Sequence, residues 1–160
     1  MNFRTADILD AHPELEACEA GLEHYGGLRR FAGAVVTVRC YEDNTLVREL
    51  LRSPGEGRVL VVDGGRSRRC ALVGDVLAAA GHAHAWAGII IAGCVRDTAA
   101  LAALPIGIMA LGVQPRRSDK SGQGAVGVPI EILGARIRPG GMAYADEDGV
   151  VFSQHPLADG

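Results

Sequence analysis

The chain of 160 residues has few aromatic side chains and almost no lysine. Phe, Trp and Tyr make up 4% of its residues, and Lys120 is its single lysine. Acidic residues outnumber Lys and Arg by 19 to 16, which gives a formal net charge of −3. Proteins that bind nucleic acid normally present a basic face and use aromatic rings to stack on bases. The composition therefore argues against direct binding of nucleic acid.

Long apolar runs and closely spaced cysteine pairs are also missing. The longest apolar run, residues 86–92, is much shorter than the ~20 residues of a membrane helix. The first ten residues hold no apolar signal core. Cys18, Cys40, Cys70 and Cys94 never form a CxxC pair, so neither a zinc ribbon nor a redox motif is indicated. We therefore expect a cytoplasmic protein without a membrane span, its four thiols reduced and mostly buried.

Glycine, in contrast, is abundant, with 22 of the 160 residues. Average proteins contain roughly 7% glycine, and the glycines here follow no fixed period, which excludes a collagen-like or repeat protein. Hydrophobic residues make up 48% of the chain, enough for a sizeable core, and its length is typical of one domain. We therefore expect a single domain over residues 1–160, rich in turns, with a frayed tail at about 153–160.

Apolar strand patterns alternate with short helical patterns along the chain. Residues 58–63 (RVLVVD) and 87–92 (AGIIIA) are apolar almost throughout, which is typical of strands buried on both faces. Further strands are predicted at residues 31–41, 106–111, 128–133, 135–137 and 149–152. Helices are predicted at residues 5–10, 14–25, 45–52, 74–81 and 98–104. Alternation of this kind predicts an α/β domain.

Three familiar motifs are absent or stand in the wrong context. Gly122, Gly124 and Gly127 spell GxGxxG, but a polar segment precedes them and a proline follows, where a dinucleotide site needs a strand and a helix. We interpret them as a mobile glycine loop. His82 and His84 have no third ligand close in sequence, so we interpret them as partly exposed residues after a helix rather than a metal site. No GxSxG elbow occurs, which excludes a hydrolase of that kind.

The strongest chemical signal lies where strands end, because ligands of α/β sheets bind outside the carboxyl ends of the strands. The predicted strand 87–92 leads into Arg96 and Asp97. An arginine can hold a carboxylate or an enolate oxygen, and an aspartate can bind a divalent metal ion. Gly74 and Asp75 open a predicted helix, whose free N–H groups can receive an anion. The alternative is that Arg96 and Asp97 form a structural ion pair and helix cap.

Six short stretches of the chain resemble the RraA-like family. They are residues 40–44 (CYEDN), 61–65 (VVDGG), 71–75 (ALVGD), 93–97 (GCVRD), 115–118 (PRRS) and 144–149 (YADEDG). The resemblance runs in order from Thr5 to Phe152, and the family includes class II 4-hydroxy-4-methyl-2-oxoglutarate aldolases and the regulator of ribonuclease E activity A. It implies a single α/β domain of the swivelling β/β/α type, an αββα sandwich. It also implies a homotrimer or a hexamer with active sites near the subunit interfaces.

The aldolase signature of that family is matched in part. The family has an Asp, twenty residues, Arg-Asp, two residues and then Glu or Asp. Here Asp75, Arg96 and Asp97 match, and Ala100 stands in place of the last carboxylate. Two further departures lie in the family's glycine turn, usually GGGSLRRAL, where this chain adds positive charge through Arg66 and Arg68.

The resemblance implies a role for each matched residue. Asp97 would bind Mg²⁺ or Mn²⁺, with water and substrate as the other ligands. Arg96 would neutralise the growing enolate oxygen, and Asp75 would orient a metal-bound water. The substrate carboxylate would be held by backbone N–H groups of Gly74, Asp75, Val76 and Leu77, so that these residues and Arg96 together bind the substrate.

The implied reaction is a retro-aldol cleavage. A small 2-oxo acid of the 4-hydroxy-4-methyl-2-oxoglutarate type would lose its C3–C4 bond and give pyruvate through an enolate. Decarboxylation of oxaloacetate passes through the same enolate and would be a side activity. The alternative function is a non-catalytic regulator that binds and inhibits ribonuclease E. Retention of Asp75, Arg96 and Asp97 favours the enzyme, because a pure inhibitor needs no metal site.

Overall fold

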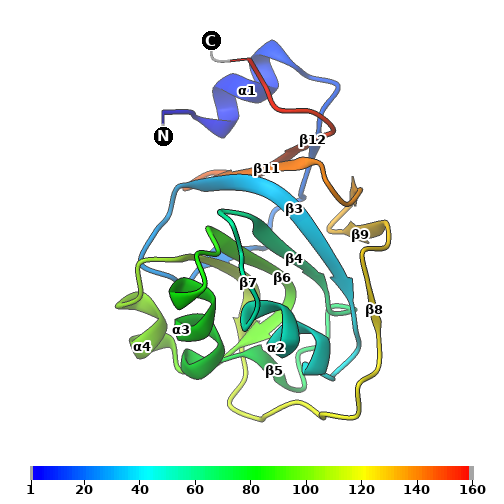
Figure 1. Ribbon diagram of the computed structural model, residues 1–160. Coiled ribbons are helices and arrows are strands. Elements are labelled where there is room, and N and C mark those ends of the chain that lie inside the picture. The colour runs from blue at the N-terminus through cyan, green and yellow to red at the C-terminus, as the bar shows by residue number, and fades with distance from the viewer. Residues whose placement is uncertain (1, 159–160) are drawn as a thin grey trace.

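The computed structural model describes residues 2–158 (Figure 1). Its helices are α1 (Thr5–Ala11), α2 (Thr45–Leu51), α3 (Asp75–Ala83) and α4 (Thr98–Ala102). Its strands are β1 (Glu16–Ala17), β2 (Glu23–His24), β3 (Phe31–Arg39), β4 (Val59–Asp63), β5 (Ala71–Val73), β6 (Gly88–Val95), β7 (Gly107–Val113), β8 (Ala125–Val126), β9 (Ile130–Ile132), β10 (Ala135–Ile137), β11 (Met142–Asp146) and β12 (Gly149–Ser153).

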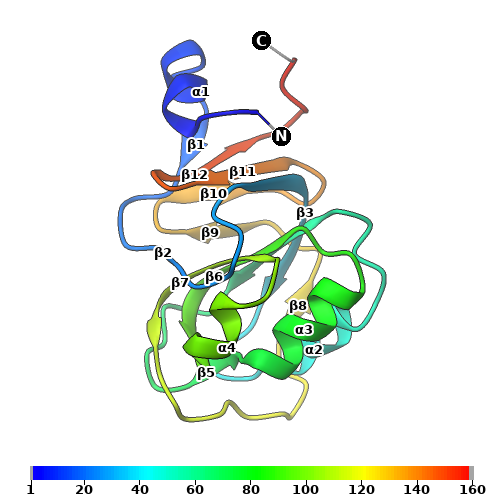
Figure 2. The same cartoon turned by 90° about the vertical axis from the view of Figure 1, so that its left-hand side faces the viewer.

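Most strands belong to one curled sheet. Strands β3, β4, β6 and β7 are parallel neighbours at its centre. Strands β11, β12 and β1 continue the sheet antiparallel beyond β3, and β2 pairs with the outer edge of β7. Short strand β5 pairs with the end of β6, β8 pairs with the end of β3, and β9 and β10 form a separate hairpin. Helices α2, α3 and α4 lie together on one side of the parallel strands (Figures 1 and 2).

The apolar central strands are buried on both faces because they separate two hydrophobic cores. In β4, Leu60 and Val62 pack into the core beneath α2, α3 and α4. Their neighbours Val59 and Val61 pack into the second core, on the opposite face. All four side chains are completely buried, as the two-residue period of a strand requires when both faces are covered. The sequence prediction for residues 58–63 is confirmed.

The second core is closed by β structure rather than by helices. Ile132 and Ile137 of the β9–β10 hairpin, with Phe31 and Phe152 from the curled sheet, fill the space against β4 and β6. Helix α1 lies beyond β11 and β12, on the far side from α2, α3 and α4 (Figure 2). The layers therefore follow the order α, β, β, α. The expected mixed α/β sandwich is confirmed.

The helix predicted at residues 14–25 is wrong. This segment is extended and forms β1 and β2 at two edges of the sheet, where Glu16 pairs with Phe152 and Glu23 with Ala110. Pairing with distant strands outweighed the local helical pattern, since propensity is a weak guide beside tertiary contacts. Strands β5, β8 and β11 were not predicted either. In β11 the inward residues are alanines, so the alternation of buried and exposed positions is faint in the sequence.

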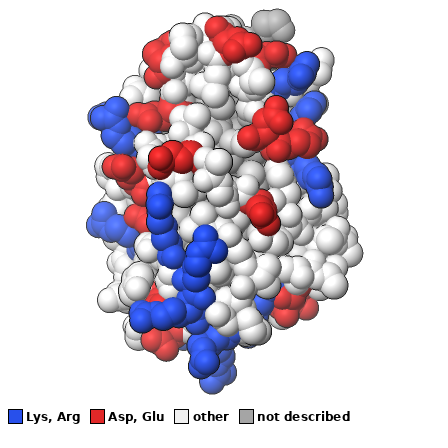
Figure 3. Space-filling view, turned by 180° about the vertical axis from the view of Figure 1, so that it is seen from behind, with Lys and Arg blue, Asp and Glu red and all other residues white. Residues whose placement is uncertain are grey.

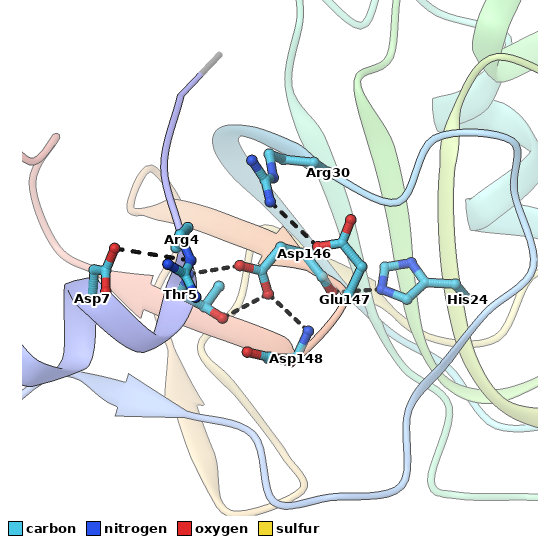
Figure 4. Close-up of polar contacts among 8 residues, drawn as sticks. All are labelled: Arg4, Thr5, Asp7, His24, Arg30, Asp146, Glu147 and Asp148. Carbon is cyan, nitrogen blue, oxygen red and sulfur yellow. Dashed lines mark hydrogen bonds and ion pairs between the residues drawn. The ribbon is translucent and has the colours of Figure 1, made fainter.

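The YADEDG stretch fastens the N-terminal helix to the sheet (Figure 4). Asp146 is buried, and its carboxylate accepts hydrogen bonds from the backbone and hydroxyl of Thr5 at 2.7 and 2.6 Å and from the backbone of Asp148 at 2.9 Å. The carbonyl of Asp146 lies 2.6 Å from Nε2 of His24. Arg30 adds an ion pair to Glu147 at 3.3 Å. This motif therefore has a structural role, away from the predicted site.

The four cysteines form no disulfide, and Cys40, Cys70 and Cys94 are buried while Cys18 is partly exposed. Burial is the main cause that raises the pKa of the Cys18 and Cys40 thiols to about 12.

Among the helices of residues 2–158, none has the length and hydropathy that a membrane crossing requires. We expected a frayed tail at about residues 153–160. Ser153 is the last residue of β12, and residues 159–160 lie outside the described part.

Candidate active site at the end of strand β6

Arg96 and Asp97 lie in the turn between β6 and α4. Asp97 has φ 62° and ψ 42°, a left-handed conformation that is uncommon for residues other than glycine. Its carbonyl begins the hydrogen bonding of α4, but its carboxylate does not cap that helix. Oδ2 instead accepts the backbone N–H of Asp75, the first residue of α3, at 3.0 Å. The unusual backbone thus aims the Asp97 carboxylate at a neighbouring helix.

Strand β5 brings the start of α3 to this turn. Val73 pairs with Val95 in parallel, and the Arg96 backbone N–H donates to the Val73 carbonyl at 3.0 Å. Gly74 follows and packs directly against the turn. A Cβ atom at Gly74 would lie 2.6 Å from Oδ2 of Asp97 and 3.2 Å from Cγ of Arg96. A larger residue at Gly74 would therefore displace the Asp97 carboxylate.

The first turn of α3 leaves backbone donors available. Ala78 makes the first hydrogen bond within the helix, to Gly74 at 3.0 Å, so the preceding N–H groups have no partner inside it. Asp97 takes the N–H of Asp75. The N–H groups of Val76 and Leu77 remain at an end where the Val76 side chain is 66% exposed. A helix N-terminus of this kind favours an anionic group.

Arg96 does not form the ion pair with Asp97 that the structural alternative required. Its Nη1 donates to the carbonyl of Pro115 at 3.3 Å, and no ion pair joins Arg96 to a carboxylate within residues 2–158. The guanidinium is partly exposed and the Asp97 side chain is exposed. Arg96, Asp97 and the start of α3 therefore meet at one edge of the sheet, with charged groups open to a ligand.

The three residues at which this chain departs from the family pattern, Ala100, Arg66 and Arg68, lie in different parts of the fold. Ala100 is exposed on α4, one turn beyond Asp97. Arg66 has φ 61° and approaches Glu19 at 3.9 Å, on another part of the surface. Arg68 donates to the carbonyl of Leu111 at 3.3 Å. The two arginines are thus engaged elsewhere and do not pair with Asp97.

A buried carboxylate that the sequence patterns did not single out lies in the turn between β3 and α2. Asp43 is 1% exposed, and its Oδ2 accepts the backbone N–H and hydroxyl of Ser121, both at 2.7 Å, and the N–H of Gly122 at 3.1 Å. Its Oδ1 accepts the N–H of Thr45 at 3.0 Å. Burial alone would raise the pKa of this carboxyl, but the hydrogen bonds from Ser121 and Thr45 outweigh it and hold the pKa well below its usual range.

The glycine-rich segment is therefore held in place, and our interpretation of it as a mobile loop is wrong. Next to Asp43, the amide of Asn44 donates to the carbonyl of Leu72 at 3.0 Å, and Lys120 donates to the Asn44 side-chain oxygen at 2.9 Å. The signal was available, because residues 42–44 directly follow a strand, the same rule that led to Arg96. Residues 42–44 (Glu-Asp-Asn) have no cationic neighbour in sequence, and nothing near them indicated that the glycine-rich segment is their partner.

A larger hollow, of about 1210 Å³, lies away from this junction. It is lined by residues of the α1–β1 segment, the β9–β10 hairpin and the chain after β12, and by none of the predicted site residues. The volume of a hollow is therefore a poor guide to the candidate site in this fold.

A family model described as "RraA-like: Aldolase/RraA" matches residues 5–152. The chain belongs to the RraA-like family. A protein of Laribacter hongkongensis named "Putative 4-hydroxy-4-methyl-2-oxoglutarate aldolase" is 51% identical over 158 residues, covering 98% of this chain and 99% of the relative. A protein of Burkholderia multivorans with the same name is 50% identical over 163 residues, covering 98% and 99%.

Two solved structures match nearly the whole chain. The RNA-processing inhibitor RraA of Thermus thermophilis has a TM-score of 0.95 and 46% identity, covering 99% of this chain and 96% of that one. A protein of Geobacillus kaustophilus, titled an S-adenosylmethionine:2-dimethylmenaquinone methyltransferase, has a TM-score of 0.93 and 48% identity, covering 99% and 100%. In this chain β8 lies inside the GxGxxG segment, between Gly124 and Gly127, and the next element is strand β9 rather than a helix, so these glycines do not form a nucleotide-binding turn.

Proposed function

We propose that this chain is a divalent-metal-dependent aldolase. It cleaves 2-oxo acids of the 4-hydroxy-4-methyl-2-oxoglutarate type to pyruvate and decarboxylates oxaloacetate as a side activity. The observation that carries the proposal is the junction of Arg96, Asp97 and the first turn of α3, where Asp97 contacts the Asp75 N–H. The names of relatives at about half identity point in the same direction.

The side chains at this junction fit a metal ion that keeps most of its water. Within residues 2–158 there is no group of three or more His, Cys, Asp or Glu side chains that could enclose a metal. Mg²⁺ is commonly held by one or two carboxylates, with water and substrate oxygens completing its shell. Asp97 offers one exposed carboxylate for this purpose. When bound, the ion would act as a Lewis acid toward the carboxylate and keto oxygens of a 2-oxo acid.

The residues of the chain divide the remaining work. The N–H groups of Val76 and Leu77 hold the substrate carboxylate, and the guanidinium of Arg96 faces the oxygen on which charge develops. The hydroxyl at C4 loses its proton to a water that the Asp75 carboxylate orients. The electron pair of the C3–C4 bond then forms the enolate, and protonation at C3 gives pyruvate. A carbonyl compound is the second product.

The exposure of the junction also agrees with an assembly. Val76 is 66% exposed although it stands at the proposed substrate position. We propose that a partner subunit of a homotrimer or hexamer covers this edge and completes the pocket. Light scattering after size-exclusion chromatography measures the mass of the assembly, and a monomer would contradict the proposal.

The decisive experiment measures pyruvate release from 4-hydroxy-4-methyl-2-oxoglutarate and from oxaloacetate, with Mg²⁺ or Mn²⁺ and then with EDTA. Lactate dehydrogenase reports the pyruvate. We expect release above the metal-only background, abolished by the chelator. Absence of release from both substrates by folded protein would contradict the proposed function.

A second candidate function rests on a separate observation. The Thermus thermophilis relative, titled an RNA-processing inhibitor, shares 46% identity and a TM-score of 0.95 with this chain. A regulator of this kind would bind ribonuclease E and slow its cleavage of RNA. Adding the chain to a ribonuclease E cleavage assay tests this, and inhibition that survives Asp97→Ala would separate binding from catalysis.

Replacing Gly74 by alanine should disturb the site without disturbing the fold. Gly74 has φ −124° and ψ −164°, which alanine adopts without strain. The new methyl group would stand 2.6 Å from Oδ2 of Asp97 and displace that carboxylate. We expect pyruvate release to fall about 10²-fold, the effect of an ångström-scale misplacement. Thermal unfolding is the control, and activity near that of wild type would contradict the geometry.

Restoring the missing carboxylate should strengthen metal binding. Ala100 is exposed on α4, close to Asp97 in the chain. A glutamate there can hydrogen-bond the water around an ion, and such outer groups change metal affinity by roughly 10–100-fold. We expect Ala100→Glu to lower the Mg²⁺ concentration for half-maximal activity. Ala100→Gln is the neutral control, and equal Mg²⁺ titrations for all three proteins would show that the position is irrelevant.

A further inference from the structure

A basic pocket of about 510 Å³ lies beside the candidate active site. Basic side chains gather on the lower part of the face seen in Figure 3, at the end of the molecule where the segment after β7 runs in Figure 1. Arg68, Arg69, Arg116 and Arg117 line the pocket. They come from the β4–β5 loop and from the segment after β7, two parts of the chain that are far apart in sequence.

One of these arginines is already neutralised. The Nε and Nη2 atoms of Arg69 donate to the two carboxylate oxygens of Glu42 at 2.7 and 2.8 Å. Hydrogen bonds from Arg69 and from the hydroxyl of Ser67 lower the pKa of the Glu42 carboxyl. Glu42 and Arg69 therefore form a complete pair in the pocket wall, and neither needs a ligand.

The other three guanidinium groups have no carboxylate partner. Arg68 donates to the carbonyl of Leu111 at 3.3 Å. Arg116 and Arg117 form no side-chain hydrogen bond or ion pair within residues 2–158. Asp119, the other acidic residue of the lining, makes no ion pair in that part of the chain. The pocket thus gathers like charges that repel one another until an anion enters.

The walls of the pocket are fixed before any ligand binds. The backbone N–H of Ala71 donates to the carbonyl of Arg116 at 2.7 Å. The side chain of Gln114 donates to the carbonyl of Arg68 at 3.0 Å and accepts the N–H of Arg116 at 3.2 Å. These bonds join the two segments that carry the arginines. The backbone of these segments is therefore ordered before a ligand binds, and only the arginine side chains would become ordered on binding.

A buried hydroxyl in the lining also lacks a partner. Ser118 is 6% exposed, and its Oγ is buried without a hydrogen bond within residues 2–158. It belongs to the lining of the same pocket. Buried polar groups of folded proteins are nearly always paired. An oxygen atom of a ligand would satisfy this hydroxyl, which is an observation independent of the arginine cluster.

We infer that this pocket binds a small oxyanion of the phosphate or dicarboxylate class. Guanidinium forks match the paired oxygens of both groups, and the Ser118 hydroxyl supplies a further donor. The volume is that of a small-molecule site. None of Gly74, Asp75, Asp97 or the α3 backbone lines this pocket, so it is distinct from the proposed aldolase site.

Isothermal titration tests the inference, with inorganic phosphate and malonate added separately to the full chain at constant ionic strength in chloride. No divalent metal or 2-oxo acid is present, so the result does not depend on aldolase activity. We expect saturable binding at one site per chain. The double variant Arg116→Ala/Arg117→Ala should lower the affinity at least about tenfold, as loss of a charge-assisted contact does. The stronger of the two anions identifies the ligand class.

Three further variants test whether the anion binds in this pocket. Ser118→Ala should also weaken binding, and Arg117→Gln replaces the double variant if the latter unfolds. Arg138→Ala, an exposed arginine outside the pocket, should bind like wild type. Binding that is unchanged in the double variant, or that is lost in Arg96→Ala alone, would place the anion elsewhere and overturn the inference. Absence of saturable binding by both anions would overturn it as well.

Discussion

Replacement of Arg96 by alanine is expected to lower kcat for pyruvate release about 10²–10³-fold, the usual cost of removing one electrostatic contact to a developing oxyanion. The guanidinium stands at the carboxyl end of β6, beside Asp97 and the free N–H groups of α3. Charge on the enolate oxygen grows in the transition state, so kcat should fall more than KM rises. Both substrates should be affected, because both pass through the pyruvate enolate.

The fold should survive this replacement. Arg96 makes one side-chain hydrogen bond, to the Pro115 carbonyl at 3.3 Å, and its guanidinium is partly exposed. Thermal unfolding of Arg96→Ala should therefore resemble that of wild type. Arg96→Lys keeps the charge but loses the planar fork, and should retain part of the activity. Near-normal turnover of both substrates by Arg96→Ala would remove the residue from the mechanism.

Replacement of Asp43 by alanine is expected to destabilise the fold by about 2–4 kcal/mol, since several hydrogen bonds to a charged group are lost at once. Asp43 joins the start of α2 to residues 121–123, and its replacement removes the hydrogen bonds that Ser121 and Gln123 make there. The expected fall in melting temperature is roughly 5–15 °C for a chain of this size. Asp119→Ala is the matched control, because Asp119 is exposed and only its backbone is engaged.

The contribution of Asp43 should depend on pH. Its pKa in the folded chain lies below the ordinary value of 3.8, although burial alone would raise it, because hydrogen bonds from Ser121 and Thr45 favour the charged form. The unfolded chain therefore takes up the proton first as pH falls. The stabilisation of the fold by the Asp43 carboxylate is therefore complete at a pH above the ordinary pKa of an aspartate, and it is lost progressively as the pH falls below that value. The difference in unfolding free energy between wild type and Asp43→Asn should shrink below about pH 4. A constant difference would contradict the assigned hydrogen bonds.

The sequence by itself determined the central sheet, its helices and the identity of the candidate residues. The runs 58–63 and 87–92 are apolar almost throughout, so side chains on both faces of each strand have to be buried. Strands β4 and β6 do separate two hydrophobic cores. Arg96 and Asp97 were found because a strand end followed by charged residues is visible without coordinates. Local patterns of this kind depend only on residues that are close together in the sequence.

Only the tertiary structure decided which distant residues complete these elements. The segment 14–25 has a helical pattern, yet its hydrogen bonds go to β12 and β7, partners that are far away in sequence. The same holds for the Asp97 contact to Asp75, for the Asp43 anchor of the glycine segment, and for the arginine pocket. In each case the groups that meet belong to different elements of the fold, and the spacing of residues along the chain does not show which elements become neighbours.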